Sequence, residues 1–318
     1  MNVRGLFAFL SSSAGALALG LLSISPPAAE AQLVPGTGTR VDGGGDDFED
    51  ATWDFVHHFP KSSHEQDKKV RDPRGYSTNQ KWYESPKRGQ PDLIQRVSTP
   101  EGGLAGSEGA LSLRTLFGDI PDRVTGKPGQ DDLMFDCQTP LGGAIPVSSQ
   151  PSVVVRVYLP PFDQWEPRTA TSFGFRTGVY AKTWEDKGLL FKRRVNKTDT
   201  FFPGIFIQLN SRHDRHVEDS AAFIIRADDN GEDFVGPTIR QTGWWTLGMS
   251  FTPDGRCHYY ARPGVEDLTE KDHIASHYSQ GIKAEQFRTY FFNVCNQSSG
   301  RTWSTEWIID DPQLYIVR

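Results

Sequence analysis

The chain has 318 residues, of which 36% are hydrophobic and 23% are charged, and its formal net charge at pH 7 is −6. This composition provides enough apolar material for a core, which excludes a largely disordered protein. The acidic balance argues against a nucleic-acid partner, because such partners need a basic surface. The three cysteines, Cys137, Cys257 and Cys295, allow at most one disulfide within the chain, so disulfides do not hold the fold together.

The first 31 residues have the pattern of a secretory signal peptide. Arg4 supplies a positive charge, residues 5–24 are small and apolar, and Ala29-Glu30-Ala31 offers a small-residue cleavage site. A transmembrane anchor is the alternative, but three serines at 11–13 interrupt the apolar run, which favours cleavage. We therefore predict an exported protein, periplasmic, cell-surface or extracellular, with no membrane span once the signal is removed.

The rest of the chain reads as one all-β domain. Residues 32–45 are rich in glycine and are predicted to form a linker. From residue 46 to residue 318, short apolar runs alternate with Gly, Pro, Asn and Asp, which is typical of strands joined by turns. Within this range, residues 265–286 are predicted to form either a short helix or a long loop. The sequence has no internal repeat, so a single β-sandwich domain is expected over 46–318.

The stretch GWWTLGMSFTPDGRCHYYARPG, residues 243–264, predicts a β-hairpin. Trp245, Leu247, Met249 and Phe251 share one face of a strand because successive side chains alternate. Residues 252–255, Thr-Pro-Asp-Gly, then supply turn chemistry, with proline fixing one φ angle and glycine accepting a positive one. The return strand is rich in tyrosine.

This hairpin resembles the central hairpin of concanavalin A-like lectin/glucanase and laminin-G-like domains. The opening DDFEDATWDF, residues 46–55, and the closing WIIDDPQLYIV, residues 307–317, are similar to the first and last strands of jelly-roll modules. The resemblance implies a two-sheet antiparallel β-sandwich of the jelly-roll type. One of its sheets is expected to be concave and to face a ligand.

Pairing of the first and last strands would bring several carboxylates together. Residues 48–50 would then lie close to Asp310, and crowded carboxylates repel unless a cation or hydrogen-bond donors neutralise them. Hard oxygen ligands select Ca²⁺, and the resemblance makes a structural calcium at Asp47, Glu49 and Asp310 an expectation. The alternative is an edge strand whose solvated acids hinder sheet-to-sheet aggregation.

The polar residues that remain after each strand's apolar set is assigned to the core are candidates for ligand binding. They are Arg156, Tyr158, Arg176, Tyr180, Gln208, Asn210, His258, Tyr260 and Arg262, with Arg288 and Tyr290 as further candidates. Aromatic rings stack on sugars, and Arg, Gln and Asn donate hydrogen bonds to hydroxyls or carboxylates. The excess of arginine favours an acidic sugar. Such residues are also ordinary on a half-solvated sheet face, so both interpretations stay open.

Whether the protein is an enzyme is left open by the motifs. Glycoside hydrolases on this scaffold typically carry Glu-x-Asp-x-x-Glu, which places two carboxylates beside the bond, and that motif is absent. Polysaccharide lyases use Tyr or His with a charge-stabilising Arg, for which His258, Tyr260 and Arg262 are candidates. The lyase strand signatures, Arg-x-Glu-x-Arg and Gln-x-His, are also absent, and FIQLN, residues 206–210, keeps only the glutamine.

The function predicted from the sequence is therefore an exported, lectin-like module that binds a glycan. A polysaccharide lyase or glycoside hydrolase on the same scaffold is the second interpretation, and a structural protein of the cell envelope is the third. The sequence leaves open which glycan is bound and whether the ligand is instead a protein. It also leaves open the oligomeric state and the pairing of the cysteines.

Overall fold

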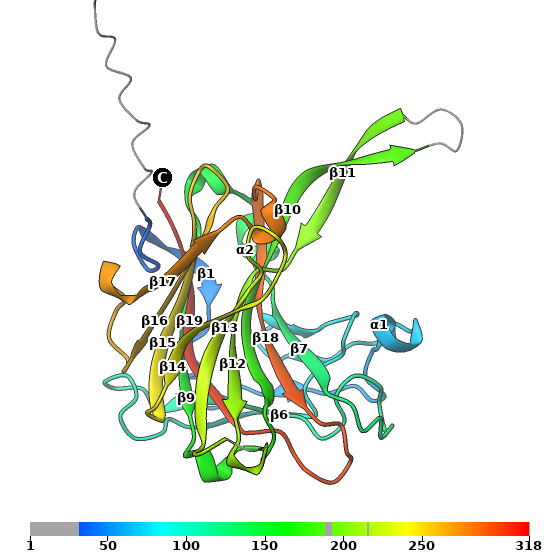
Figure 1. The fold of residues 1–318 in the computed structure, drawn as a ribbon, viewed down its shortest axis with the longest axis vertical. Helices are drawn as coiled ribbons and strands as arrows, with labels where there is room; N and C mark the ends of the chain where they lie inside the picture. Colours follow the sequence, from blue (N-terminus) through cyan, green and yellow to red (C-terminus); the bar gives the residue numbers. More distant parts are fainter. Residues whose placement is uncertain (1–31, 188–192, 215, 318) are drawn as a thin grey trace, which may run out of the picture. The chain divides into compact units, whose positions relative to one another are not determined.

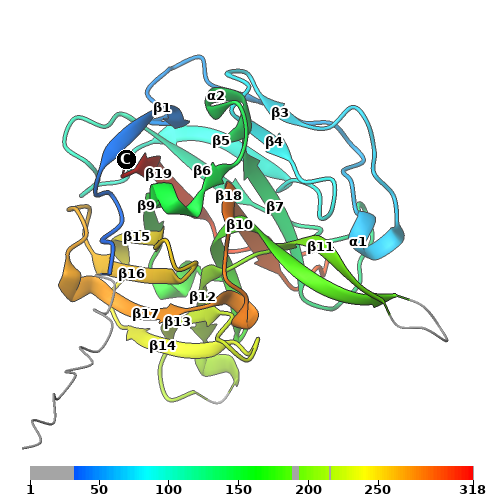
Figure 2. The same cartoon turned by 90° about the horizontal axis from the view of Figure 1, so that it is seen from above.

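A computed structural model describes residues 32–187, 193–214 and 216–317. The predicted signal peptide, 1–31, lies outside the described residues. Two antiparallel sheets face each other across an apolar core, as the view from above shows (Figures 1 and 2). This confirms the predicted two-sheet β-sandwich. Over the described residues, no helix combines the length and the apolar character needed to cross a membrane.

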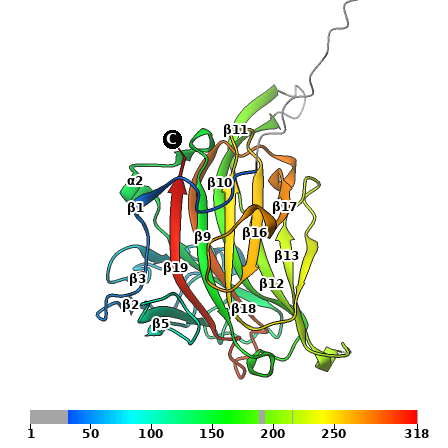
Figure 3. The same cartoon turned by 90° about the vertical axis from the view of Figure 1, so that its left-hand side faces the viewer.

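The first sheet has eight strands (Figure 3). From one edge to the other they are β17 (His273–His277), β16 (Cys257–Pro263), β15 (Gly243–Phe251), β9 (Ser152–Leu159), β19 (Trp307–Ile316), β6 (Gly109–Arg114) and β5 (Leu93–Ser98), and β1 (Thr39–Gly45) pairs with β19.

The second sheet has eleven strands and carries the long β10–β11 hairpin that extends to the upper right in Figure 1. Its order is β14 (Phe234–Ile239), β13 (Ser220–Arg226), β12 (Gly204–Asn210), β10 (Ala170–Lys187), β18 (Gln286–Asn296), β7 (Gly129–Phe135), β4 (Trp82–Glu84), β3 (Tyr76–Ser77) and β2 (Phe55–Val56), with β11 (Arg193–Phe201) beside β10 and β8 (Ile145–Pro146) beside β18. The described helices are short: α1 (His64–Asp67), α2 (Gln138–Leu141), and the 3₁₀ turns η1 (Val147–Ser149), η2 (Phe162–Gln164), η3 (Arg212–Asp214), η4 (Glu270–Asp272) and η5 (Ser279–Gly281).

The core follows from the alternation of side chains along each strand. In β9, Val153, Val155 and Val157 point inward and are fully buried. Each such side chain contributes roughly 1.5–3 kcal/mol relative to an exposed position. The predicted face of residues 245–251 also belongs to this core, and the turn at 252–255 joins β15 to β16, with Phe251 opposite Cys257. The predicted hairpin is therefore confirmed.

The first described strand pairs with the last, as the resemblance implies, but this first strand is β1 and not the predicted segment 46–55, of which only Phe55 belongs to a strand, β2 of the other sheet. Residue Thr39 of β1 lies opposite Ile316 of β19. β19 lies between β9 and β6 and is not an edge strand. Its register against β9 shifts between Asp310 and Gln313, and Asp311 has a positive φ of 44°. The pair of aspartates therefore marks a β-bulge, which redirects the two acidic side chains.

Two segments differ from their sequence predictions. Residues 39–45, predicted as part of a linker, form β1, because Val41 packs into the core and Gly45 lies against β19. A side chain at Gly45 would collide with Gln313, so this glycine serves close strand contact and not flexibility. Residues 265–286, predicted as a helix or loop, contain strand β17, which pairs with β16.

The three cysteines are buried free thiols. Cys257 and Cys295 lie on β16 and β18, which belong to different sheets. Burial raises the pKa of each thiol, which keeps it protonated and unreactive.

Candidate functional site

A row of directly opposed residues crosses the outer face of the 11-stranded sheet. The register pairs Arg226 with Gly204, Gly204 with Arg176, and Arg176 with Phe291. The row continues from Phe291 to Met134 and from Met134 to Tyr83. Opposed residues project to the same side of a sheet. Six strands thus contribute to one polar and aromatic stripe, away from the core.

A cavity of about 290 Å³ opens along this stripe. Its cationic lining residues are Arg74, Lys87, Arg88, Arg176, Arg226 and Arg288, and its one acidic lining residue is Asp132. Tyr83, Phe202 and Phe291 supply aromatic surface. We call this cavity with its lining the arginine cavity. The absence of a side chain at Gly204 leaves room for Arg176 in this cavity, because a Cβ atom at position 204 would collide with the aliphatic part of the Arg176 side chain.

Arg176 lies in the arginine cavity without an ionic partner. Only 7% of its surface is exposed, and no carboxylate among the described residues forms an ion pair with it. Its guanidinium donates to the carbonyl oxygen of Phe202, at 2.7 Å from Nη2. It also lies 5.3–5.5 Å from the ring centroids of Phe202, Phe206 and Phe291. Burial lowers the pKa of Arg176 to about 9, which expresses the cost of a desolvated cation.

Of the other arginines that line the cavity, some form ion pairs with carboxylates and some do not. Arg88 binds Glu65 through two hydrogen bonds of 2.8 Å, and Arg226 binds Asp233 in the same two-point manner. Arg288 lies over the Tyr180 ring, 5.2 Å from its centroid, and forms no ion pair with a described residue. Burial raises the pKa of Asp132, whose carboxylate accepts from Gln130 and Asn293. The cavity is therefore electropositive.

The predicted ligand-binding residues divide between the two sheets. Arg176 lines the arginine cavity, and Tyr180, Gln208 and Asn210 lie on the same sheet, outside the lining. Gln208 donates to Asn210 across 3.3 Å. Of the further candidates, Arg288 lines the cavity, whereas Tyr290 is fully buried between the sheets.

The other five predicted residues lie on the opposite side of the sandwich, which corrects the expectation of one shared face. Arg156, Tyr158, His258, Tyr260 and Arg262 are on β9 and β16 of the eight-stranded sheet. The reason is the strand order: β9 and β16 flank β15, whereas β10 and β12 are neighbours in the other sheet.

The three lyase candidates on β16 contact other parts of the chain, which limits their access to a ligand. His258 is 3% exposed, with its ring nitrogens 2.9 Å from the Thr252 hydroxyl and 2.7 Å from the Ser276 hydroxyl. Tyr260 is fully buried beside Leu268, and Arg262 donates to the Asp267 carbonyl. Two of the three side chains expected to act in a lyase are therefore out of reach of a polymer, which argues against that assignment.

The predicted calcium ligands lie near the β1–β19 pairing but bind protein donors. The Asp310 carboxylate accepts from the Ser107 hydroxyl at 2.9 Å, and Glu49 accepts from the backbone N–H of Glu108 at 3.1 Å. Asp47 accepts from the backbone of Glu49. In the described part of the chain, no group of three His, Cys, Asp or Glu side chains is arranged to hold a metal ion. Calcium at this place stays a prediction.

Several cavity residues escape sequence reasoning. Arg74, Lys87 and Arg88 come from loops that flank short strands, where a basic residue is ordinarily solvated. The alternation of β7 and β13 marks Asp132 and Arg226 as outward residues only once their inner faces are known. The available signal is the pair of turn-rich basic segments at 71–76 and 85–90, which bracket the aromatic strand β4.

No protein-family model and no curated protein matches the sequence. Solved structures with a similar fold include the carbohydrate esterase vb_24B_21 from Shiga toxin-encoding bacteriophage phi24B, at 11% identity, 81% coverage of this chain, 97% of that chain and a TM-score of 0.43. The PL7 alginate lyase AlyA1 from Zobellia galactanivorans matches at 8% identity, 71% and 85% coverage and a TM-score of 0.37. The Emp46p carbohydrate recognition domain matches at 11% identity, 87% and 98% coverage and a TM-score of 0.37. The two-sheet antiparallel architecture that the resemblance implies is present in the described chain itself.

Proposed function

We propose that this protein is an exported module that binds an anionic polysaccharide in the arginine cavity. The observation that carries the proposal is Arg176, a buried guanidinium with no carboxylate partner. A desolvated charge without a counterion is unfavourable, and an anionic ligand group would offset that cost. Arginine is also suited to carboxylate and sulfate groups, because its planar donors bind two oxygens at once.

The rest of the lining supports a sugar polymer carrying such groups. Arg288 forms no ion pair with a described residue, and Arg74 pairs only with the exposed Asp72, at 3.4 Å, so both add positive charge to the cavity lining. Tyr83 and Phe202 offer rings on which the apolar face of a sugar can stack. Regularly spaced acidic sugars would satisfy several of these cations together, which a neutral glycan would not.

The test is native electrophoresis through gels cast with neutral, sulfated or uronic-acid polysaccharides. The mature protein is expected to be retarded by an acidic polymer and not by a neutral one, and added salt should weaken the retardation because exposed charges are screened. Arg176→Met should abolish it. The matched control is Arg262→Met, which removes one positive charge from the other sheet and should leave retardation unchanged.

The results separate the two faces of the sandwich. Loss of retardation in Arg262→Met, with Arg176→Met unaffected, would place the ligand on the eight-stranded sheet and reject the arginine cavity. Absence of retardation in every acidic gel would reject the binding function itself.

A degrading activity at the same cavity is the second candidate, favoured by the position of Tyr83. Tyr83 is one of the lining residues, and although burial raises its pKa, the nearby Arg288 acts to lower it. A tyrosine beside an arginine can take a proton from a sugar whose carboxylate is neutralised. Clearing of the polymer stain around the band, lost in Tyr83→Phe, would establish this activity, whereas retardation over intact stain would establish binding alone.

A further inference from the structure

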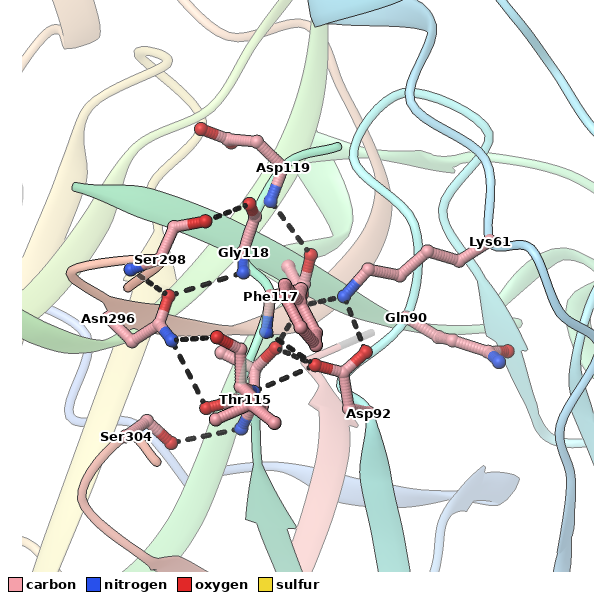
Figure 4. A network of polar contacts seen from close by, with 12 residues as sticks. Lys61, Gln90, Asp92, Thr115, Phe117, Gly118, Asp119, Asn296, Ser298 and Ser304 are labelled. Carbon is pink, nitrogen blue, oxygen red and sulfur yellow. Dashed lines mark hydrogen bonds and ion pairs between the residues drawn. The ribbon is translucent and has the colours of Figure 1, made fainter. Parts of the chain in front are cut away.

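Lys61 and Asp92 lie together in a buried polar network (Figure 4), and Asp131 is a second aspartate bound to the same lysine. The side chain of Lys61 is 1% exposed, and its Nζ atom lies 2.5 Å from Oδ2 of Asp131 and 2.8 Å from Oδ1 of Asp92. Asp131 is fully buried on the core-facing side of β7, and Asp92 precedes β5. Nothing in the arginine cavity uses these groups.

The two carboxyl groups are in different protonation states. Burial raises the pKa of Asp131 to about 8, so at neutral pH it is largely a carboxylic acid. Burial also opposes ionisation of Asp92, but Lys61 and the N–H groups of Leu116 and Phe117 outweigh it and lower its pKa. Asp92 is therefore a carboxylate.

With Lys61 as an ammonium group, the three buried side chains carry no net charge. Burial alone would lower its pKa, but the neighbouring carboxyl groups raise it, so Lys61 carries an ammonium group. One ammonium, one carboxylate and one carboxylic acid sum to zero charge, which is the arrangement that a dry site tolerates best.

These are the three partners that an amide-forming condensation needs. Asp131 is an uncharged carboxylic acid, Lys61 carries the amine within contact distance, and Asp92 is a base hydrogen-bonded to that amine. The backbone N–H of Asp119 donates to Oδ1 of Asp131 at 3.3 Å, and the Thr115 hydroxyl donates to Oδ2. Such donors stabilise the negative charge that develops on a carboxyl oxygen under attack.

We propose that Lys61 and Asp131 condense into an intramolecular isopeptide bond, with Asp92 as the proton acceptor. The ammonium gives one proton to the Asp92 carboxylate, and the free amine attacks Cγ of Asp131. The Cγ–OH bond breaks, and the leaving hydroxyl takes a second proton from the nitrogen to depart as water. The product is one amide, one water molecule and a protonated Asp92, so no oxidant or other reagent is consumed.

The fold supplies the driving force that free groups in water lack. Well-oriented groups held in contact react as though at effective concentrations of roughly 10⁵–10⁸ M, and burial keeps hydrolytic water away from the bond. The bond would join the segment before α1 to β7 across 70 residues of sequence. Its value to an exported chain is a covalent cross-link where the cysteines provide none.

The decisive measurement is the intact mass of the folded wild-type protein under denaturing, reducing conditions, compared with the mass calculated from its determined N-terminus. The wild type is expected to be lighter by one water molecule. Peptide mapping should recover a branched peptide that joins the residues around Lys61 to those around Asp131. Lys61→Met should have the full calculated mass, and Lys87→Met, which removes an exposed lysine of the arginine cavity, should keep the deficit.

Two further variants test the chemistry. In Asp131→Asn the attacked group is an amide, so any bond that forms releases ammonia, and the deficit should change from water to ammonia. In Asp92→Asn the proton acceptor is lost, and the folded protein should keep its full mass. Wild-type protein of full calculated mass, with separate peptides around Lys61 and Asp131, would overturn the proposal even if every variant failed to fold. A water deficit that persists in Lys61→Met would overturn it equally.

Discussion

Among the residues whose burial is described, each outer face of the sandwich buries one arginine, and the partners of the two arginines differ. Arg156, on the eight-stranded sheet, is 5% exposed and pairs with Asp267 at 2.9 Å and Asp311 at 3.1 Å. Arg176, on the 11-stranded sheet, is 7% exposed and donates only to a carbonyl oxygen. The residue type and the burial are the same, so neither identifies a binding site. What distinguishes the open face is that no described carboxylate pairs directly with its buried arginine, although Asp132 lines the same cavity.

The largest expected effect lies on the closed face. Arg156→Met should lower the free energy of unfolding by about 3 kcal/mol, because it leaves the half-buried Asp311 without its counterion. Urea denaturation at pH 7 measures this. Arg240→Met, which breaks an exposed pair with Glu218, is the control and should change stability by less than about 1 kcal/mol. Equal stability of the two variants would remove the distinction between closed and open faces.

A pH effect is expected from the same closed face. Burial, with a smaller contribution from His273, lowers the pKa of His258 to about 4, below its value near 6.5 in the unfolded chain. Between these values the unfolded state binds more protons, so this group's contribution is complete above about pH 6.5 and is lost as the pH falls toward 4. The slope is about 1.4 kcal/mol per pH unit.

His258→Gln isolates this contribution, because glutamine retains hydrogen bonding but does not titrate. Unfolding curves from pH 7 to pH 4.5 should show a smaller loss of stability in the variant than in the wild type. Parallel profiles would mean that His258 accepts a proton in the folded protein without penalty, and that this face is more solvated than its 3% exposure implies.

On the open face, removal of the buried arginine should hardly change stability. Arg176→Met replaces an unpaired guanidinium by an apolar side chain among three aromatic rings, so the free energy of unfolding should stay within about 1 kcal/mol of wild type or rise. Retention by acidic polysaccharide should nevertheless be lost. A loss of stability as large as that of Arg156→Met would show that Arg176 is a structural residue, and the proposed function would lose its main support.

The sequence predicts the sandwich better than it predicts the site, and the hairpin shows why. Residues 245–251 alternate so regularly that their core face and the following turn are settled by local chemistry. Whether β9 and β10 share a sheet depends on strand pairings distant in sequence, which no local pattern encodes. Because those pairings cannot be read from local sequence, the division of the predicted ligand-binding residues between the two sheets could not be predicted.

The glycine-rich segment at the end of β1 and the acidic residues of β19 show two further limits of local sequence patterns. The run at 43–45 has the composition of a linker, and only its contact with β19 shows that it is a strand. The pairing of the first and last strands was implied by the resemblance, but the first strand beside β19 is β1 and not the predicted segment 46–55. The bulge at Asp310 and Asp311 depends on the register of β19 against β9, which no local sequence pattern encodes.

The smallest expected effect concerns calcium at this bulge. Burial raises the pKa of Asp310 to about 6, and nearby Glu49 contributes to the rise, so the carboxyl group is ionised at pH 7.5 but largely protonated at pH 5.5. A cation binds the ionised form. After chelation, Ca²⁺ at a concentration equal to its dissociation constant should therefore stabilise the protein by about 0.4 kcal/mol at pH 7.5, and by less at pH 5.5. Asp310→Asn is the control and should show no response. If titration calorimetry at pH 7.5 detects no heat, the Ser107 hydroxyl and the backbone donors alone neutralise these acids, and both ends of the chain are joined without an ion.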